Sequence, residues 1–303
     1  MEPGIEAELL EYWRSRKKLI DAAVDSLLES AEEAGAIEVA KYIAQGGKRF
    51  RGVLVMLSCE ALGGTPQDAL DAAVAVELVH AASLALDDII DHDTFRRGRP
   101  AAWVVHGISR TVLISNFVIP LAQKLVERYG FRAVQHTIQS WLDVTRGEIL
   151  DVFNVAPSPK AGPGLYEKII DLKTGSLFQL SVDLGIIAAG VKKYDGFPLY
   201  GRLLGKAYQV ADDIVDLKLI AEGRLREIYP ILRLAAEWMA GREVKLPEEA
   251  GVAVEGGLRK LRSLVAEATS LADTLPATRF REYLKAIPVF MASKMLEESG
   301  LSL

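Results

Sequence analysis

Two copies of one acidic pattern, each inside an apolar stretch of helical period, constrain the chain more than any other feature. The first copy, DDIID, covers residues 87–91, and the second, DDIVD, covers residues 212–216. On a helix the first and last carboxylates of each copy lie one turn apart on one face, and the middle carboxylate lies at the edge of that face. Like charges at this spacing cost roughly 0.2–0.5 kcal/mol per pair even on an exposed helix. Because buried charge must be paired or must bind metal, the pattern predicts a cation site.

The ion that best fits such a site is Mg²⁺. It takes carboxylate oxygens, keeps several waters and shares the phosphate oxygens of a substrate. Two clusters that face one cavity would offer it six carboxylates. The expected ligands are Asp87, Asp88, Asp91, Asp212, Asp213 and Asp216.

Composition excludes several other classes of protein. The chain has 303 residues, of which 50% are hydrophobic, and a net charge of −5, so no basic field points to nucleic acid. The single cysteine, Cys59, excludes an internal disulfide and fits a reducing cytoplasm. The acidic N-terminus is unlike a signal peptide, and no stretch of about 18 uncharged apolar residues predicts a membrane span. Asparagine occurs only at Asn116 and Asn154, which is typical of heat-adapted proteins.

Apolar residues recur at three- and four-residue spacing along nearly the whole chain, which predicts helices. The expected helical segments are 5–34, 66–92, 108–128, 131–153, 165–190, 198–220, 225–240, 256–273 and 277–298. Glycine and proline mark breaks between them, among them 97–100, 157–164 and 245–257. None of these breaks is long enough to be a domain linker. We therefore expect an all-α fold, with residues 1–303 forming one large helical bundle around a central cavity.

Two basic segments accompany the acidic ones. Arg96, Arg97 and Arg99 follow the first acidic copy, where guanidinium groups can clamp phosphate oxygens that metal ions do not hold. The other segment, GGKRFRG, covers residues 46–52, and its glycines let the backbone approach an anion. Taken alone, the first segment is better explained as a self-neutralising surface ion cluster, and the second is weak evidence for an anion site. The spacing of nucleotide-binding phosphate loops is absent.

Three single residues extend the predicted site. His80 precedes Asp87 by two helical turns and lies on nearly the same face, where it is either a core histidine or a phosphate contact. Lys173 is one lysine in an apolar helix, and either reaches the surface or stabilises charge in the cavity. Gln209 lies close enough to the second acidic copy to hydrogen-bond there. No serine or cysteine nucleophile arrangement is found, which favours metal-assisted departure of a phosphate group.

In this order and spacing, the motifs resemble those of the trans-isoprenyl diphosphate synthase (polyprenyl synthetase) family. The match runs from about Gly46 to Arg233. DDIID with the following Arg96-Arg97-Gly98 is similar to the family's first aspartate-rich motif, and QVADDIVD at 209–216 is similar to its second. Lys48 and Arg51 match GGKxxR, residues 147–151 (GEILD) resemble GQxxD, and residues 173–175 match KTG.

The resemblance implies an all-α fold, usually in a homodimer, and an Mg²⁺-dependent head-to-tail condensation of isopentenyl diphosphate with an allylic prenyl diphosphate. It implies three Mg²⁺ ions per site, with Mn²⁺ as an alternative. It also implies a catalytic set and a substrate-binding set. The catalytic set is Asp87, Asp88, Asp91, Arg96, Lys173, Thr174, Gln209 and Asp212. The substrate-binding set is Lys48, Arg51, His80, Arg96, Arg97, Lys173, Arg224 and Arg233.

Two departures from the family pattern accompany the match. After the second motif the family usually carries a Gly-Lys loop, an aspartate and a further lysine. Here Arg224 and Arg233 stand in the places of the lysines and Glu227 in that of the aspartate, within a shortened loop. Ala85 and Leu86 occupy places just before the first motif where the family often has a histidine or an equivalent polar residue.

Small residues one turn before Asp87 predict a deep pocket for the product tail. Ala82 and Ser83 stand there, whereas short-chain enzymes of the family carry an aromatic plug, so a product of about C20 or longer is expected. Phe117 on a neighbouring helix is the residue that would close such a pocket. Two alternatives stay open: a class I terpene cyclase, and a catalytically silent subunit that binds prenyl diphosphates or an active partner.

Overall fold

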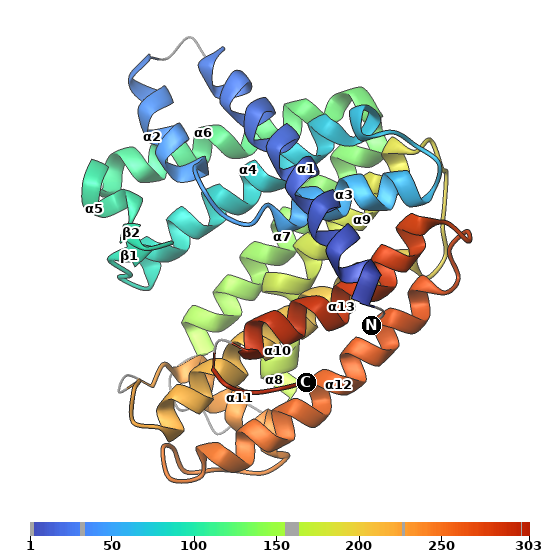
Figure 1. Ribbon diagram of the computed structural model, residues 1–303. Helices are drawn as coiled ribbons and strands as arrows, with labels where there is room; N and C mark the ends of the chain where they lie inside the picture. The colour runs from blue at the N-terminus through green and yellow to red at the C-terminus, as the bar shows by residue number, and fades with distance from the viewer. Residues whose placement is uncertain (1–2, 31–33, 155–163, 226–227, 298) are drawn as a thin grey trace. The chain divides into compact units, whose positions relative to one another are not determined.

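The computed structural model of the chain describes residues 3–30, 34–154, 164–225, 228–297 and 299–303 (Figure 1). Its regular structure is almost entirely helical, which confirms the all-α fold class. The α-helices are α1 (Pro3–Glu29), α2 (Ala34–Ala44), α3 (Phe50–Ala61), α4 (Pro66–Ile90), α5 (Ala102–His106), α6 (Ile108–Val126), α7 (Phe131–Asn154), α8 (Gly164–Ile170), α9 (Ser176–Ala188), α10 (Phe197–Ala221), α11 (Pro230–Ala240), α12 (Ala250–Ala272) and α13 (Arg279–Glu297).

Contacts between Cα atoms divide the chain into two compact units. The amino-terminal unit contains residues 8–138 and 181–193, and the carboxy-terminal unit contains residues 1–7, 139–180 and 194–303. Each unit is therefore assembled from stretches that are distant in sequence, and α1, α7 and α9 contribute residues to both. The first acidic motif belongs to the amino-terminal unit and the second to the carboxy-terminal unit. A single domain around a central cavity stays a prediction.

Helix α4 is the core of the amino-terminal unit, where it packs against α3 and α6. It begins at a capping box: the Thr65 hydroxyl accepts from the Asp68 amide at 3.3 Å, and the Asp68 carboxylate accepts from the Thr65 amide at 2.9 Å. Pro66 occupies the first helical position, where its missing N–H costs nothing. Helix α4 alone among the described helices is long and apolar enough to cross a membrane, but 67% of that window is buried inside the protein. Such burial is that of a core helix.

Helix α10 is the core of the carboxy-terminal unit, and it lies beside α12 and α13 (Figure 1). It starts after Gly196, whose φ of 82° only glycine adopts easily, and Pro198 again fills the first turn. The Tyr200 side chain is fully buried and its hydroxyl donates to the Leu284 carbonyl of α13 at 2.7 Å. Tyr200 precedes Asp212 by twelve residues, about 18 Å along the helix, so this bond fixes the helix that carries the second motif without contacting the motif itself.

Several features of the fold differ from the sequence-based expectation, among them helices α2 and α3, which lie almost entirely outside the predicted helical segments. A hairpin of two short strands, β1 (Phe95–Arg96) and β2 (Arg99–Pro100), follows the first acidic motif, although no strand was predicted. Of the expected segment 225–240, the described helix α11 covers Pro230–Ala240. The predicted break at 245–257 is wrong beyond residue 249, because α12 begins at Ala250 and includes Gly256 and Gly257.

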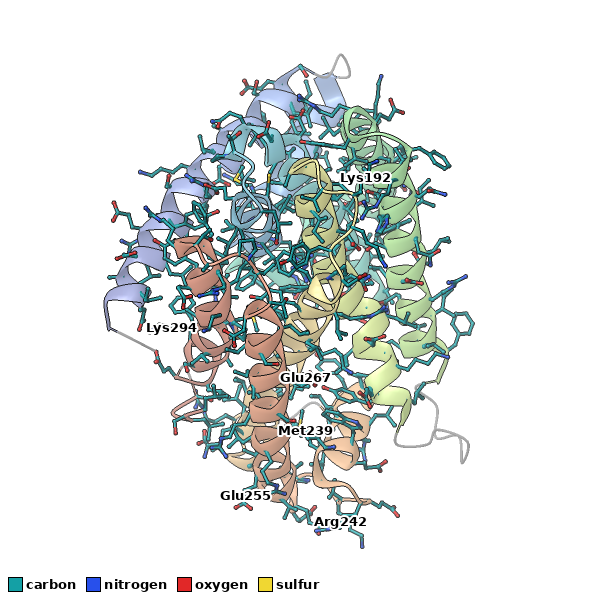
Figure 2. All side chains as sticks on the ribbon, turned by 90° about the vertical axis from the view of Figure 1, so that its right-hand side faces the viewer. Lys192, Met239, Arg242, Glu255, Glu267 and Lys294 are labelled. Atoms are coloured by element: carbon teal, nitrogen blue, oxygen red, sulfur yellow. The ribbon has the colours of Figure 1, made fainter. Side chains whose placement is uncertain are left out.

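The glycine pair in α12 allows close helix packing and does not mark the end of a helix. A Cβ atom on Gly256 would lie 2.1 Å from the Met239 carbonyl oxygen of α11, and one on Gly257 would lie 2.7 Å from the Met239 sulfur. Met239, which is labelled in Figure 2, is 2% exposed. Glycine is therefore required at residue 256 by the approach of a neighbouring backbone, a cause that the sequence of α12 does not display.

Candidate active site

The first acidic motif ends α4, and its middle carboxylate is the buried one. Asp88 is 2% exposed and accepts from Arg96 Nε at 2.7 Å, while Arg96 also lies 3.2 Å from Asp93. Burial raises the pKa of Asp88, and the Arg96 guanidinium partly offsets that rise. Asp87 is half-buried and Asp91, at the end of the helix, is exposed. The β1–β2 hairpin therefore brings Arg96 back onto the acidic end of α4.

The second acidic motif, on α10, has the same arrangement. Asp213 is 5% exposed; it accepts from the Tyr166 hydroxyl of α8 and, at 3.1 Å, from the Gln209 side-chain amide. Burial raises its pKa to about 7, with Asp212 adding to the rise. Burial and the neighbouring Asp212 charge also raise the pKa of Asp216, to about 6. Asp212 itself is exposed.

The two motifs therefore have the same pattern of burial. In each motif the middle carboxylate is buried and hydrogen-bonded within its own unit, and the outer two are more accessible. No group of three or more acidic, histidine or cysteine side chains among the described residues is gathered to hold a metal ion by itself. This donor chemistry fits Mg²⁺, because that ion is usually held by one or two carboxylates and completed by water and substrate phosphates.

Five of the eight residues predicted to bind substrate belong to the amino-terminal unit: Lys48, Arg51, His80, Arg96 and Arg97. Arg51 Nη1 lies 2.9 Å from His80 Nε2. Burial and the nearby guanidinium groups of Arg51 and Arg97 hold the pKa of His80 well below its usual range. The imidazole is therefore neutral at neutral pH, and its Nε2 accepts a hydrogen bond from Arg51. His80 is thus oriented by a cation rather than packed as an isolated core histidine.

Arg97 completes this basic group from the β1–β2 hairpin. Its φ of 55° is left-handed, and its Nη1 donates to the Gln45 carbonyl at 2.9 Å. A Cβ atom on Gly47 would lie 3.0 Å from the Arg97 guanidinium carbon, so glycine is required for this approach. Within the described residues Arg97 forms no ion pair with a carboxylate. Burial, with the adjacent Arg49 charge, lowers its pKa. A guanidinium held without a counter-ion suits an incoming anion.

A buried brace under the loop was missed at the sequence level. Arg49 is 4% exposed and has a left-handed φ of 53°. Its guanidinium donates to Asp21 of α1 at 2.7 Å and to the Ala44 carbonyl of α2 at 2.7 Å, and lies 3.6 Å from Glu77 of α4. Glu77 also accepts from the Gly52 amide at 2.7 Å. The brace therefore ties the loop that carries Lys48 and Arg51 to the helix that carries His80.

Lys173, in the carboxy-terminal unit, lies between two carboxylates of α7. Its Nζ is 2.6 Å from Glu148 and 3.0 Å from Asp151. Residues Asp171–Gly175 form a π-helical turn between α8 and α9, a feature that is frequent at functional sites. A Cβ atom on Gly147 would lie 2.6 Å from the Lys173 backbone nitrogen, which shows how closely α7 approaches this turn. The Lys173 side chain is therefore paired with carboxylates and does not extend alone into solvent.

Thr174 and Gln209 lie beside each other in the same unit. The Thr174 hydroxyl donates to the Gln209 side-chain oxygen at 3.0 Å, and Gln209 in turn donates to Asp213. A Cβ atom on Gly205 of α10 would lie 2.8 Å from the Gly175 Cα. The glycine of the KTG match therefore lets the π-turn pack directly on the helix that carries the second acidic motif.

The remaining predicted residues are less closely associated with these groups. Arg224 is exposed and pairs with Glu222 at 3.1 Å, and Arg233 is exposed on α11. Glu227 lies outside the described residues. Ala82 is fully buried, whereas Ser83 is half-buried and donates to the His80 carbonyl at 2.8 Å. Of these two, Ser83 lies on the Asp87 face of α4, because it precedes that residue by four positions.

A cavity of about 320 Å³, open mouth included, lies between α2, α4 and the β1–β2 hairpin. Guanidinium groups and the Asp88 carboxylate line one part of it, and mostly apolar side chains line the rest. The lining residues are Tyr42, Ile43, Ala81, Leu84, Ala85, Asp88, Arg96, Arg97, Arg99, Pro100 and Ala102. Because Arg96 and Arg97 belong both to this cavity and to the predicted diphosphate contacts, the cavity is part of the same site.

The buried Asp213 gives a pH-dependent prediction. Its pKa of about 7 in the folded protein exceeds the ordinary value of 3.8, so the folded state retains a proton that the unfolded chain has released between those pH values. The contribution of Asp213 to the free energy of unfolding therefore falls as pH rises through this window. We expect the free energy of unfolding of Asp213→Asn, relative to that of the wild type, to increase by roughly 1–3 kcal/mol between pH 4 and pH 7.5.

The measurement is urea denaturation of both proteins in EDTA at several pH values. Asp25→Asn on the exposed surface of α1 is the matched control and should parallel the wild type. A stability difference between Asp213→Asn and wild type that stays constant with pH would contradict the raised pKa.

Known proteins resemble this chain over most of its length. The family model described as polyprenyl synthetase matches residues 35–223. Hexaprenyl pyrophosphate synthase of Saccharolobus solfataricus is 33% identical over 302 residues, covering 97% of this chain and 98% of the relative. Octaprenyl diphosphate synthase of Escherichia coli is 29% identical, covering 98% of this chain and 90% of the relative.

Solved structures support the fold. The polyprenyl synthase from Caulobacter crescentus, solved with calcium and isoprenyl diphosphate, aligns with a TM-score of 0.81 at 24% identity over 94% of this chain and 96% of that one. The geranylgeranyl pyrophosphate synthetase from Pyrococcus horikoshii aligns with a TM-score of 0.80 at 24% identity, covering 95% and 98%. The chain therefore belongs to the polyprenyl synthetase family of prenyltransferases.

Proposed function

We propose that the chain joins isopentenyl diphosphate head to tail to an allylic prenyl diphosphate in an Mg²⁺-dependent reaction. The observation that carries this proposal is that Arg51, His80 and Arg97 gather in the amino-terminal unit, beside the loop that carries Lys48, whereas Lys173 belongs to the carboxy-terminal unit. An enzyme that joins two diphosphates needs two anion sites. A terpene cyclase has one diphosphate substrate and would leave this group without a purpose.

In the proposed reaction the carbon–oxygen bond of the allylic diphosphate breaks first. Arg96 and Lys173 would bind the allylic diphosphate, and Asp87, Asp91, Asp212 and Asp216 would supply carboxylates to the ions beside it. When bound, Mg²⁺ neutralises the charge that develops on the departing pyrophosphate. Preorganised charges of this kind usually supply the largest part of such a rate enhancement.

The second half of the reaction forms the new carbon–carbon bond. Lys48, Arg51, His80 and Arg97 would hold isopentenyl diphosphate while its double bond attacks the allylic cation. The family resemblance makes the Lys173 and Thr174 carbonyls of the π-turn candidates to stabilise that cation, while the Thr174 hydroxyl donates to Gln209. The released proton passes to the departed pyrophosphate, which balances the reaction.

The purified chain tests the proposal directly. It is incubated with labelled isopentenyl diphosphate, an allylic diphosphate and Mg²⁺, and the products are separated by chain length. A longer diphosphate supports elongation, and a hydrocarbon or alcohol would instead indicate cyclisation. Absence of turnover would favour the silent, partner-dependent subunit, for which the pairing of Arg224 with Glu222 is the one motivating contact.

Product length is the finer part of the proposal. We propose a product of about C20 or longer, because Ala82 and Ser83 are small.

Ser83→Phe is expected to shorten the main product by one or more isoprene units, measured with farnesyl diphosphate as starter. Ala82→Phe should also shorten the product, but it should lower the free energy of unfolding by about 1–3 kcal/mol, because Ala82 is fully buried. Ser83→Ala, which adds no bulk, is the control. A main product of C15 or less from the wild type, or one that Ala82→Phe does not change, would contradict this assignment.

We also propose that the protein is a homodimer that pairs through α7. Leu142, Ile149 and Phe153 recur on one face of this helix and are 45%, 50% and 79% exposed. A recurring apolar face on a charged helix is typical of a helix that is covered by another subunit. The test is the oligomeric state by analytical ultracentrifugation: the wild type should sediment as a dimer and Ile149→Glu as a monomer. Cytoplasmic location and a heat-adapted source stay predictions.

A further inference from the structure

Arg99 of the β1–β2 hairpin is bound to the end of α2. Its Nη1 donates to the Gln45 side-chain oxygen at 2.7 Å, and its Nη2 donates to the Tyr42 carbonyl at 2.5 Å and to the Gln45 carbonyl at 3.1 Å. Its Cζ lies 4.1 Å from the centre of the Tyr42 ring, a cation–π contact. Carbonyl groups at the end of a helix lack partners within the helix and attract cations. Arg99 therefore joins the hairpin to the end of α2.

The same backbone oxygen also holds Arg97. The Gln45 carbonyl accepts from Arg97 Nη1 at 2.9 Å as well as from Arg99 Nη2, so one acceptor joins both arginines to α2. Arg97 and Gly98 form the turn of the hairpin with left-handed φ angles of 55° and 73°. This backbone conformation is unfavourable for arginine, and a two-stranded hairpin is only marginally stable by itself. The position of Arg97 therefore depends on contacts that hold the hairpin from outside.

Arg96 is anchored in a different way. It lies opposite Arg99 in the register of the hairpin, but its guanidinium donates to Asp88 of α4 at 2.7 Å and lies 3.2 Å from Asp93. These carboxylates hold Arg96 without any contribution from α2. Loss of the Arg99 contacts should therefore displace Arg97 more than Arg96.

We propose that Arg99 is a positioning residue for isopentenyl diphosphate, because it holds the Arg97 guanidinium in place beside Gly47. A Cβ atom on Gly47 would lie 3.0 Å from the Arg97 guanidinium carbon, so this approach is close. The inference rests on the proposed function, in which Arg97 binds isopentenyl diphosphate and Arg96 binds the allylic diphosphate. A guanidinium group that is already in place loses less freedom when it binds phosphate oxygens. Arg99 thus acts on the binding of one substrate and not on the bond that breaks.

The decisive variant is Arg99→Lys, which keeps the positive charge but replaces a planar fork of donors with a single nitrogen. We expect KM for isopentenyl diphosphate to rise about tenfold, the order of loss expected when a binding group is no longer held in position. KM for the allylic diphosphate and kcat should each change by less than about twofold, because only binding of the other substrate is affected. Gln45→Leu, which leaves both carbonyl contacts of Arg99, should raise the same KM by about threefold.

Two comparisons separate positioning from charge and from folding. If Arg99 acted only through its charge, Arg99→Lys would match the wild type and Arg99→Ala alone would raise KM. If Arg99 only supported the fold, both KM values would rise together and kcat would fall. Either result overturns the inference. Arg110→Lys, the same substitution at an exposed residue of α6, is the matched control and should leave all three constants unchanged.

Calorimetric titration of isopentenyl diphosphate into the full chain, in EDTA and without the allylic substrate, separates this inference from the proposed function. If the wild type binds isopentenyl diphosphate, and Arg99→Lys binds it more weakly by the same factor as the expected rise in KM, the role of Arg99 stands even where the wild type fails to elongate and the proposed reaction falls. Elongation by the wild type, with equal Kd values for the two proteins, overturns the role of Arg99 alone. Absence of binding by the wild type overturns both.

Discussion

Replacing Asp87 with asparagine is expected to lower kcat by about a hundredfold to a thousandfold, the loss that removal of one preorganised stabilising group typically produces. The amide keeps the size of the carboxylate and one of its acceptor oxygens, but it removes the negative charge that a hard cation requires. Asp87 is half-buried on α4, one turn before the exposed Asp91. Its loss should therefore leave the helix folded.

The measurement is kcat at saturating substrate over a range of Mg²⁺ concentrations. We expect the variant to need a higher metal concentration as well as to turn over more slowly. Asp71→Asn, near the other end of the same helix, is the matched control, since Asp71 pairs with Arg128 at the surface. If Asp87→Asn retained more than about a tenth of the wild-type kcat, the first acidic motif would not be the metal site.

The largest effect on stability is expected for Gly256→Ala. The added Cβ would lie 2.1 Å from the Met239 carbonyl oxygen, a backbone atom that cannot rotate away. Helices α11 and α12 would have to separate, and overpacking of this kind costs typically about 1–3 kcal/mol, occasionally more. We expect about 3 kcal/mol here, because the obstacle is backbone rather than a flexible side chain.

Gly251→Ala provides the matched control for this prediction. It lies in the same helix, and a Cβ atom there would meet nothing within 4 Å. Alanine has the higher helix propensity, so this variant should be stabilised by up to about 1 kcal/mol. Both values come from urea denaturation of the purified chain. Equal effects of the two substitutions would mean that the α11–α12 approach is not as close as described.

The acidic motifs illustrate how far spacing alone predicts a site. The period of the helix places the outer carboxylates of each copy on one face, and the structure agrees that the middle one differs, since Asp88 and Asp213 are buried. Which partners satisfy the middle carboxylates was not predictable. Arg96 reaches Asp88 through a hairpin, and Tyr166 reaches Asp213 from a separate helix. These contacts depend on tertiary packing.

The brace beneath the basic loop shows a similar limit. The sequence presents Lys48, Arg49 and Arg51 as three equivalent cations, but Arg49 is 4% exposed and occupied by Asp21, Ala44 and Glu77. A left-handed backbone at Arg49 turns its side chain into the protein. No local pattern distinguishes it from its neighbours, although a glutamate inside the apolar stretch 72–79 was a signal that some cation must be buried nearby.

What the sequence by itself determined is the helical class, most of the long helices and the residue types of the site, because periodicity and the chemistry of carboxylates and guanidinium groups are local properties. What only the tertiary structure decided is which charges are paired. The contacts of Lys173 with Glu148 and Asp151, the π-turn that Gly147 and Gly205 make room for, and the glycine contact between α11 and α12 all join segments distant in the chain. Their energies depend on distance and burial, which appear only when those segments meet.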